Sequence, residues 1–456
     1  MRNRYLLIAV CFSFLMFSCK VTKKVIRPNI DVPEQLEVNY TDTMSVADMA
    51  WWEVFKDTTL QKLIRKTLEN NKDFKIASAK VEELAALKRI SWAKLLPEAN
   101  LSIYGQKEGL NYGGDDFKPD PEFAMKGIVN WELDLWGNLR WGKEKGYAEY
   151  MVGLEEQRAM KMSLVAQVAE LYFELVALDH ELNTVRRTLK ARGEGVKLAK
   201  IRFEGGLTSE TSYLQAKLEY ARTFALIPDL ERKIIRKENE ILLLAGTYPD
   251  QVEREKMLED EQLPRIVPVG LTSDLLERRP DVRKAEYQLK VSNAALGIAY
   301  TNMFPRISLT SHFGVETDEL NALLKSPMYF LSANLLSPLF SFGKNKVQWK
   351  AKEAVYKQDC YRYEKTVMAA FYDAKNAIVD FNKMKESYAS KVLLLESAKS
   401  AMELAQLQYI NGVIAYLDVL DAQRSYFDAQ VGLSNALRDK QITMVRLYKA
   451  LGGGWQ

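Results

Sequence analysis

Sixty-eight consecutive residues between Gly343 and Gly412 include neither proline nor glycine. Proline breaks helices and glycine weakens them. An α-helix rises 1.5 Å per residue, so this stretch can form a single helix about 100 Å long. Helices of globular proteins average about 11 or 12 residues. The stretch therefore predicts a fold built around unusually long helices.

The apolar residues of this region predict that the long helix is packed against others. Steps of three and four residues separate successive small or apolar positions, which is the spacing of a helical seam. Alanine is frequent among them and allows helices to approach closely. The seam positions before and after Gly412 are Leu394, Ala398, Ala401, Ala405, Val419, Ala422, Tyr426, Ala429, Leu433 and Ala436.

The chain also contains an internal repeat, which bears directly on the fold. Residues 199–246 align without gaps on residues 405–452, and Gly206 then falls on Gly412. The order of features is the stronger argument: each half shows a helix, a proline, two alternating segments, a glycine and a long helix. We predict two structural repeats of the same design.

The predicted boundaries follow from that order. The first repeat spans 51–246, with a strand pair at about 99–136 and a helix-to-helix turn near 205. An equatorial linker at 247–272 connects it to the second repeat. That repeat spans 273–456, with a strand pair at about 306–342 and a turn near 412.

The expected strands alternate between apolar and polar residues. Trp131, Leu133 and Leu135 alternate with polar neighbours, as do Ile307 and Leu309. This period suits a membrane β-barrel, although a half-buried soluble sheet has the same period. Past the N-terminal region no segment resembles a transmembrane helix, so a membrane crossing would need a closed barrel. Four strands cannot enclose a conducting pore, so several chains would have to pool their strands.

The N-terminus predicts export and lipid attachment. Arg2 and Arg4 precede an apolar run at 5–17, which is shorter than the roughly 20 residues of a membrane span. A secretion signal at 1–18 is expected. Ser18-Cys19 resembles a lipoprotein signal, in which Cys19 is acylated and begins a lipid-anchored extension at 19–50. The alternative is an ordinary signal with an incidental cysteine.

Composition argues against several classes of function. The net charge of +4 gives no nucleic-acid footprint, so no nucleic-acid partner is expected. Only two histidines are present, and Cys360 is the one cysteine outside the N-terminal region. Because nucleophile motifs and glycine-rich phosphate loops are also lacking, we expect no catalytic residues, no metal site and no cofactor.

Four motifs, spread over nearly the whole chain, carry a family resemblance. They are WWEVFKD at 51–57, DLLERRPDV at 274–282, YLDVLDAQ at 416–423 and LYKALGGGW at 447–455. The chain resembles the TolC-like outer-membrane efflux proteins, particularly the lipoprotein branch of tripartite pumps. The resemblance implies a mainly α fold with a small β part. Three chains would pool four strands each into a 12-stranded transmembrane β-barrel on a periplasmic α-helical coiled-coil tunnel.

The same resemblance implies a function and a set of partners. The chain would be the passive exit duct of a tripartite pump that exports small toxic molecules, anchored in outer-membrane lipid with a periplasmic extension. Its partners would be two further copies of itself, a periplasmic adaptor protein and an inner-membrane transporter of the resistance-nodulation-division type. The alternatives are the outer-membrane component of a type I protein secretion system and a non-conducting, lipid-anchored periplasmic scaffold.

The resemblance further implies that the two helix-to-helix turns dock the adaptor. Glycine suits such tight reversals, so plain helix caps would also explain them. We call these turns the first tip and the second tip. The first comprises Gly205, Gly206, Leu207, Thr208 and Ser209, and the second comprises Asn411, Gly412, Val413, Ile414 and Ala415.

Asp418 and Asp421 follow the second tip on one helix face, three residues apart. They match the family's entrance constriction. In a trimer they would form two rings of carboxylates that select cations; in isolation they would be a solvated helix start, favoured by the helix dipole. Their counterparts in the first repeat are the uncharged Ser212 and Gln215. The basic residue that latches some relatives is absent, and Ile414 stands nearby.

Overall fold

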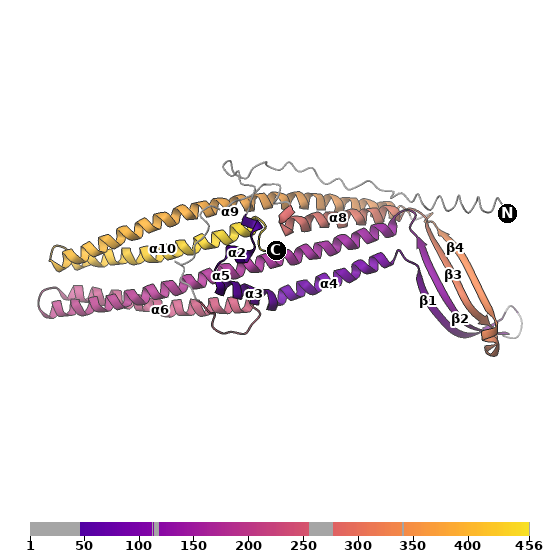
Figure 1. Cartoon of the computed structure of the whole chain (residues 1–456), viewed down its shortest axis with the longest axis horizontal. Coiled ribbons are helices and arrows are strands. Elements are labelled where there is room, and N and C mark those ends of the chain that lie inside the picture. Colours follow the sequence, from indigo (N-terminus) through magenta and orange to yellow (C-terminus); the bar gives the residue numbers. More distant parts are fainter. Residues whose placement is uncertain (1–45, 112, 114–117, 255–276, 340–341, 456) are drawn as a thin grey trace. The chain divides into compact units, whose positions relative to one another are not determined.

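The computed structural model describes residues 46–111, 113, 118–254, 277–339 and 342–455 (Figure 1). The predicted secretion signal and Cys19 lie outside these residues, as does most of the expected linker at 247–272. The chain divides into two compact units, and each draws on both sequence repeats. The first unit contains residues 79–154 and 284–365, and the second contains 46–78, 155–283 and 366–455 where described.

Four long helices confirm the predicted internal repeat. α5 (Asn138–Glu204) and α9 (Lys344–Ile410) have 67 residues each, and α6 (Glu210–Leu244) and α10 (Tyr416–Ala450) have 35 each. Each helix of the second repeat begins 206 residues after its counterpart, at 344 against 138 and at 416 against 210. The proline-free and glycine-free stretch after Gly343 is therefore one helix, as its composition predicts.

Shorter helices begin each repeat and precede its strands. Asp57 caps one of them, α3, because its carboxylate accepts hydrogen bonds from the backbone N–H groups of Thr59 (2.7 Å) and Leu60 (3.1 Å). The shorter elements are η1 (Val46–Asp48), α2 (Trp51–Val54), α3 (Thr58–Asn70), α4 (Lys72–Ala93) and α8 (Pro280–Thr301).

The first unit contains one antiparallel sheet of four strands. The strands lie side by side in the order β1-β2-β3-β4, and β2 pairs with β3 across the two repeats (Figure 1). The strands are β1 (Glu98–Leu110), β2 (Lys118–Leu133), β3 (Arg306–Thr317) and β4 (Pro327–Leu336), with the short helix η3 (Leu320–Lys325) between the last two.

The expected alternation continues to Leu135 in the sequence, but β2 ends at Leu133. The cause is Asp134, whose carboxylate accepts hydrogen bonds from the backbone N–H groups of Leu139 and Arg140, both at 2.9 Å. These groups belong to the first turn of α5, where backbone N–H groups have no partner inside the helix. The chain therefore leaves the sheet to start the long helix.

The core of the second unit lies between its long helices. Leu175 of α5, Ile241 of α6, Ala374 of α9 and Met444 of α10 are all fully buried. The predicted seam is confirmed at its alanines 398, 405, 429 and 436, which are buried. Leu394, which is 48% exposed, and Ala401, which is also exposed, are exceptions. Small residues at the seam thus let these helices pack closely.

Within the parts of the chain that the structure describes, no helix is both long enough and apolar enough to cross a membrane.

Candidate functional site

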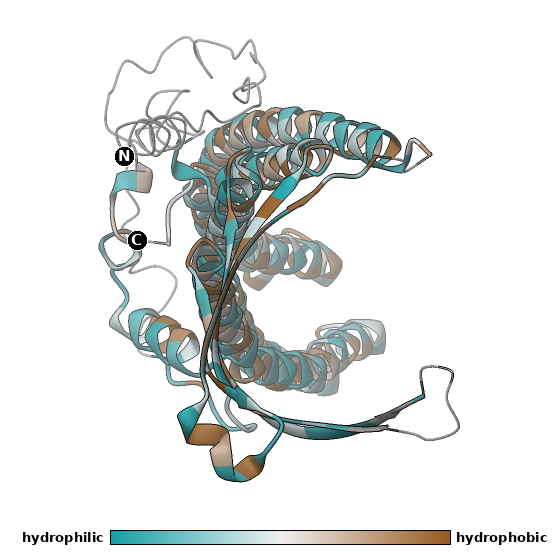
Figure 2. Cartoon of the chain, turned by 90° about the vertical axis from the view of Figure 1, so that its right-hand side faces the viewer, coloured by the Kyte–Doolittle hydropathy of each residue, from teal (hydrophilic) through white to brown (hydrophobic). Residues whose placement is uncertain are grey.

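The sheet has one apolar face that no described residue covers. Register places Leu101, Phe313 and Tyr329 in one row across the strands. These side chains are 66%, 74% and 85% exposed, respectively. Hydrophobic and hydrophilic residues alternate along the strands in Figure 2. A face of this size and composition would be poorly solvated by water.

The opposite face of the sheet is polar and paired internally. The Nζ of Lys126 lies 2.9 Å from a carboxylate oxygen of Glu316 and 3.6 Å from one of Glu122. Tyr104 donates a hydrogen bond to Glu122 and accepts one from Lys126. Because the largely buried Lys126 is paired with these two carboxylates, this face can line an aqueous space without leaving that charge unpaired.

The two outer strands of this sheet, β1 and β4, each pair with a single neighbour among the described strands. Each therefore presents an edge of unpaired backbone N–H and C=O groups. Such edges template pairing with another chain. The sheet is complete only when both edges find partners.

The two tips have the same backbone geometry. At the first, Gly206 N–H donates to the carbonyl of Phe203 (2.9 Å) and Leu207 N–H to that of Arg202 (2.8 Å). At the second, Gly412 and Val413 make the same pair of bonds, at 3.0 and 2.9 Å. This is the Schellman motif. Its glycine position requires positive φ, and Gly206 and Gly412 have φ of 69° and 75°.

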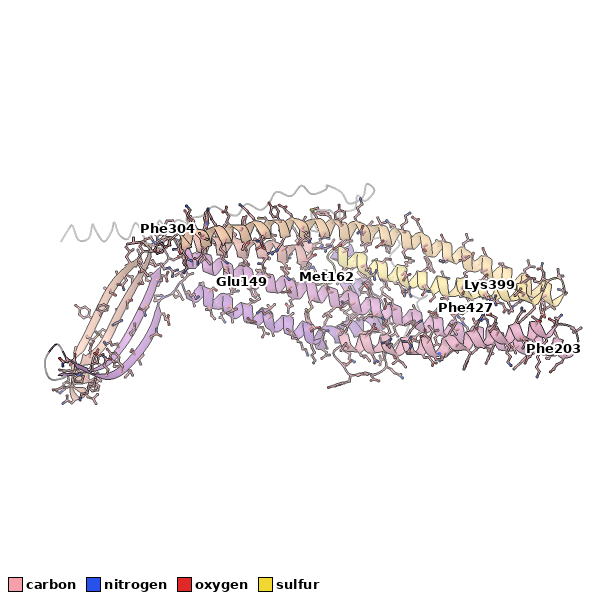
Figure 3. All side chains as sticks on the ribbon, turned by 180° about the vertical axis from the view of Figure 1, so that it is seen from behind. Glu149, Met162, Phe203, Phe304, Lys399 and Phe427 are labelled. Carbon is pink, nitrogen blue, oxygen red and sulfur yellow. The ribbon has the colours of Figure 1, made fainter. Side chains whose placement is uncertain are left out.

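Both tips expose apolar side chains. Leu207 of the first tip is 72% exposed and Val413 of the second is 67% exposed. The helix pairs α5–α6 and α9–α10 meet just behind the tips, where the guanidinium of Arg202 lies 4.8 Å from the ring centroid of Tyr409. Phe203, also beside the first tip, is labelled in Figure 3. The structure thus joins the two predicted docking turns through a cation–π contact.

Asp418 and Asp421 lie in the first turns of α10, and both are exposed. The carboxylate of Asp418 accepts a hydrogen bond from the backbone N–H of Ala415 at 3.0 Å, so it caps its own helix. Asp421 accepts from the Nη1 of Arg424 at 2.7 Å. Asp421 is therefore ion-paired, which makes the two predicted ring residues electrostatically different.

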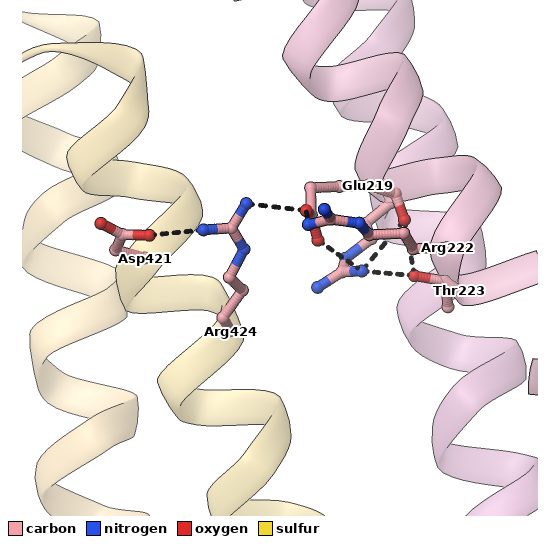
Figure 4. Close-up of polar contacts among 6 residues, drawn as sticks. Glu219, Arg222, Thr223, Asp421 and Arg424 are labelled. Carbon is pink, nitrogen blue, oxygen red and sulfur yellow. Dashed lines mark hydrogen bonds and ion pairs between the residues drawn. The ribbon is translucent and has the colours of Figure 1, made fainter.

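Arg424 also contacts the first repeat, through a buried carboxylate. Glu219 of α6 is only 3% exposed, and its Oε1 lies 2.7 Å from Arg424 Nη2 (Figure 4). Arg222 reaches the same oxygen at 2.7 Å, and Arg192 of α5 reaches Oε2 at 3.1 Å. We call Glu219, Arg192, Arg222 and Arg424 the Glu219 cluster.

The surroundings keep Glu219 ionised. Burial alone would raise the pKa of its carboxyl group, but the hydrogen bond from Arg424, the charge of Arg192 and the hydrogen bond from Arg222 outweigh burial and lower that pKa. The hydrogen bond to Glu219 in turn raises the pKa of Arg424. Three cations therefore share one buried anion, and removing that anion would deprive the largely buried Arg192 of its ion pair.

Comparison with known proteins decides the family. The family model described as outer membrane efflux protein matches residues 63–247 and 271–453. The chain belongs to the outer membrane efflux protein family. The two matched segments correspond to the two halves of the chain, and the predicted location in the bacterial outer membrane is confirmed.

Several members of this family are similar to the chain over nearly its whole length. A probable outer membrane lipoprotein, SilC of Salmonella typhimurium, is 29% identical and covers 98% of both chains. The solvent efflux pump outer membrane protein SrpC of Pseudomonas putida is 32% identical over 88% of this chain and 87% of its own. The cation efflux system protein CusC of Escherichia coli O157:H7 is 28% identical over 99% of both.

A solved structure of CusC confirms the predicted fold class. It superposes with a TM-score of 0.87 at 27% identity, and it covers 96% of this chain and all of that one. CusC undergoes conformational changes that accompany its folding and transmembrane channel formation. The chain thus has the TolC-like fold of this family's channel proteins, mainly α-helical with four strands.

The Glu219 cluster of this efflux protein could not be predicted from the sequence. The spacing of Glu219 and Arg222, three residues apart on a helix, signals only a local ion pair. Arg424 directly follows the YLDVLDAQ motif, and its spacing from Asp421 signals another local pair. The contact between Glu219 and Arg424 spans 205 residues, so no local pattern could indicate it.

Proposed function

We propose that this chain is one of three identical subunits of an outer-membrane channel that serves as the passive exit duct of a tripartite efflux pump. One observation carries the proposal: in a member of the outer membrane efflux protein family, the sheet exposes an apolar face and two unpaired edges. Three such sheets joined edge to edge would give twelve strands with no free edge. Lipid would contact the apolar face and water the polar one.

The tips would dock a periplasmic adaptor protein that connects the duct to an inner-membrane transporter of the resistance-nodulation-division type. Exposed Leu207 and Val413 at matching positions of the two tips support this assignment, since both offer an apolar contact. Replacing each by aspartate should abolish cross-linking to the adaptor. Leu243→Asp, at an exposed leucine (78%) at the end of α6 away from the tips, is the control.

Asp418 and Asp421 would form the entrance constriction, and the Glu219 cluster would hold it closed. Arg424 ties the start of α10 to α6, so α10 cannot move away without separating Arg424 from a buried carboxylate. Breaking a buried ion pair costs several kilocalories per mole. Some relatives have a basic residue that latches the closed state, and this chain lacks it near Ile414. The Glu219 cluster would take over that role.

The pump would supply the work, and the chain would perform no chemistry on its cargo. The similar proteins are named for a solvent pump and for a cation efflux system, which supports small toxic molecules as the class of cargo. SilC is named a lipoprotein, which supports acylation of Cys19. Labelling cells with radioactive palmitate tests this, with Cys19→Ser as the variant that should lose the label.

Conductance in planar bilayers tests the channel itself. The purified trimer should show a small cation-selective conductance that rises in Asp418→Ala and Asp421→Ala. A verified trimer without conductance, in the parent and in both variants, would contradict the proposal and favour a periplasmic scaffold.

A further inference from the structure

A cavity of about 240 Å³ lies between α5, α9 and α10, wholly inside the second unit. Phe427, one of its lining residues, is labelled in Figure 3. The predicted tips, the gate aspartates and the sheet do not contribute to it. The residues that matter for its chemistry are Arg187 and Arg192 of α5, Met402 of α9, and Tyr426, Phe427 and Gln430 of α10.

The charge of the lining favours an anion. Two guanidinium groups, those of Arg187 and Arg192, line the cavity, and its described lining residues include no carboxylate. Both sit on α5, five residues apart. An arginine presents several N–H donors in a fixed plane, which suits a carboxylate. These two positive charges would repel a cationic ligand.

Arg192 still has an unused donor. Its side chain is only 10% exposed, and its Nη1 already binds Glu219 and Thr223. Its Nε is buried and has no hydrogen-bond partner in the part of the chain that the structure describes. A buried N–H without a partner is unfavourable, because it has lost its bond to water without gaining another. Nε is closed off from the cavity by neighbouring atoms, but Nη2, for which the described residues offer no partner, can donate to a carboxylate oxygen in the adjoining cavity.

The remaining lining selects for an aromatic body. The ring of Phe427 lies 5.8 Å from the guanidinium carbon of Arg192, and Tyr426 and Met402 add polarisable surface. Pockets for drug-sized molecules have about 300–1,000 Å³, so this cavity holds a single ring. We propose that the cavity between α5, α9 and α10 is a binding site for a small aromatic carboxylate, with its carboxylate at Arg192 and Arg187.

Occupancy would act on the Glu219 cluster, since Arg192 belongs to both. A ligand stabilises whichever conformation contains its site. The cavity exists with Arg424 bound to Glu219, so the ligand should favour that latched arrangement and reduce conductance. This consequence rests on the proposed channel function, whereas binding itself does not.

Titration calorimetry of the purified full-length protein with benzoate tests the site. Benzamide is the neutral probe of the same shape. Benzoate should bind at least about tenfold more tightly than benzamide, because the charged group strengthens its hydrogen bonds to arginine. Equal affinity, or no heat from either compound, would overturn the proposal.

Two variants locate the binding. Arg187→Gln removes one guanidinium that is exposed and should weaken benzoate binding severalfold, while Arg186→Gln, at an exposed neighbour outside the lining, should leave it unchanged. Ala191→Phe, at a lining position, fills the cavity and should abolish binding. Circular dichroism shows whether each variant keeps its helices. Benzoate affinity unaffected by both Arg187→Gln and Ala191→Phe would place binding elsewhere and refute the site.

Discussion

Arg424 binds Glu219 at 2.7 Å and joins the helix that carries the predicted gate residues to a helix of the other repeat. The two residues are 205 positions apart. Arg424 holds Asp421 with its other terminal nitrogen, also at 2.7 Å. One guanidinium thus connects an exposed acid at the expected entrance with a buried acid inside the helical pack.

Glu219→Gln should open the channel and destabilise the helical part. It leaves Arg192, Arg222 and Arg424 around a neutral side chain, and losing one partner of a buried pair costs about 3 kcal/mol. We expect higher conductance and an earlier denaturant midpoint by circular dichroism. Arg222→Gln is the matched control, because Arg222 is 59% exposed and its loss should cost under about 1 kcal/mol. Equal effects of the two changes would contradict the latch.

Acid should weaken the same latch. Because the pKa of Glu219 is lowered in the folded protein, its contribution is fully present above the ordinary value of 4.5 and is lost as pH falls through the lowered pKa. Conductance of the parent should therefore be steady from pH 7 to about 5 and rise below pH 4.5. Glu219→Gln should lack this rise. A rise of the same size in both proteins would show that another group titrates.

Two substitutions of Asp418 should distinguish its role as a helix cap from its role as a charge in the gate. Asp418→Asn keeps an oxygen that can accept the Ala415 N–H, whereas Asp418→Ala loses the cap at a cost of about 1 kcal/mol. Both variants lose the ring charge, so both should lower cation selectivity, measured as reversal potential in a KCl gradient. Only the alanine variant should also be less stable. Unchanged selectivity in both would remove Asp418 from the gate.

Gly412→Ala should cost about 1–2 kcal/mol, because an L-residue is strained at the positive φ of 75° found there. No atom lies within 4 Å of the added methyl group, so strain alone is measured. Gly195→Ala, inside α5, meets only an ordinary contact with Tyr416 and should raise stability by up to about 1 kcal/mol. Chemical denaturation compares the two, and opposite signs are expected.

Leu331→Arg should block assembly in the membrane, since arginine on a lipid-facing strand position costs about 2–4 kcal/mol at the bilayer centre. Leu331 is 74% exposed on the apolar face. Its neighbour Ser332 points to the opposite face, so Ser332→Arg is the control and should be tolerated. Trimer yield from outer-membrane fractions measures both. Normal assembly of Leu331→Arg would show that this face does not meet lipid.

The sequence alone determined the long helices, the repeat and the faces of the strands. Each depends on local information. The absence of proline and glycine between Gly343 and Gly412 permits one long helix. Gly206 and Gly412 mark the turns because few other residues adopt positive φ. Alternation assigns Leu309 and Ser308 to opposite faces whatever their partners are. The four sequence motifs indicated the family, and the matching family model confirms it.

Only the tertiary structure decided which distant residues meet. In the repeat alignment Arg424 corresponds to Leu218 and Glu219 to Ser425, so the symmetry of the sequence gives no hint of their contact. Burial of Glu219 and the arginine-lined side of the α5–α9–α10 cavity arise where helices from both repeats pack together. Local pattern specifies which residues share a helix face, but electrostatics acts through space and depends on which faces the packing brings together.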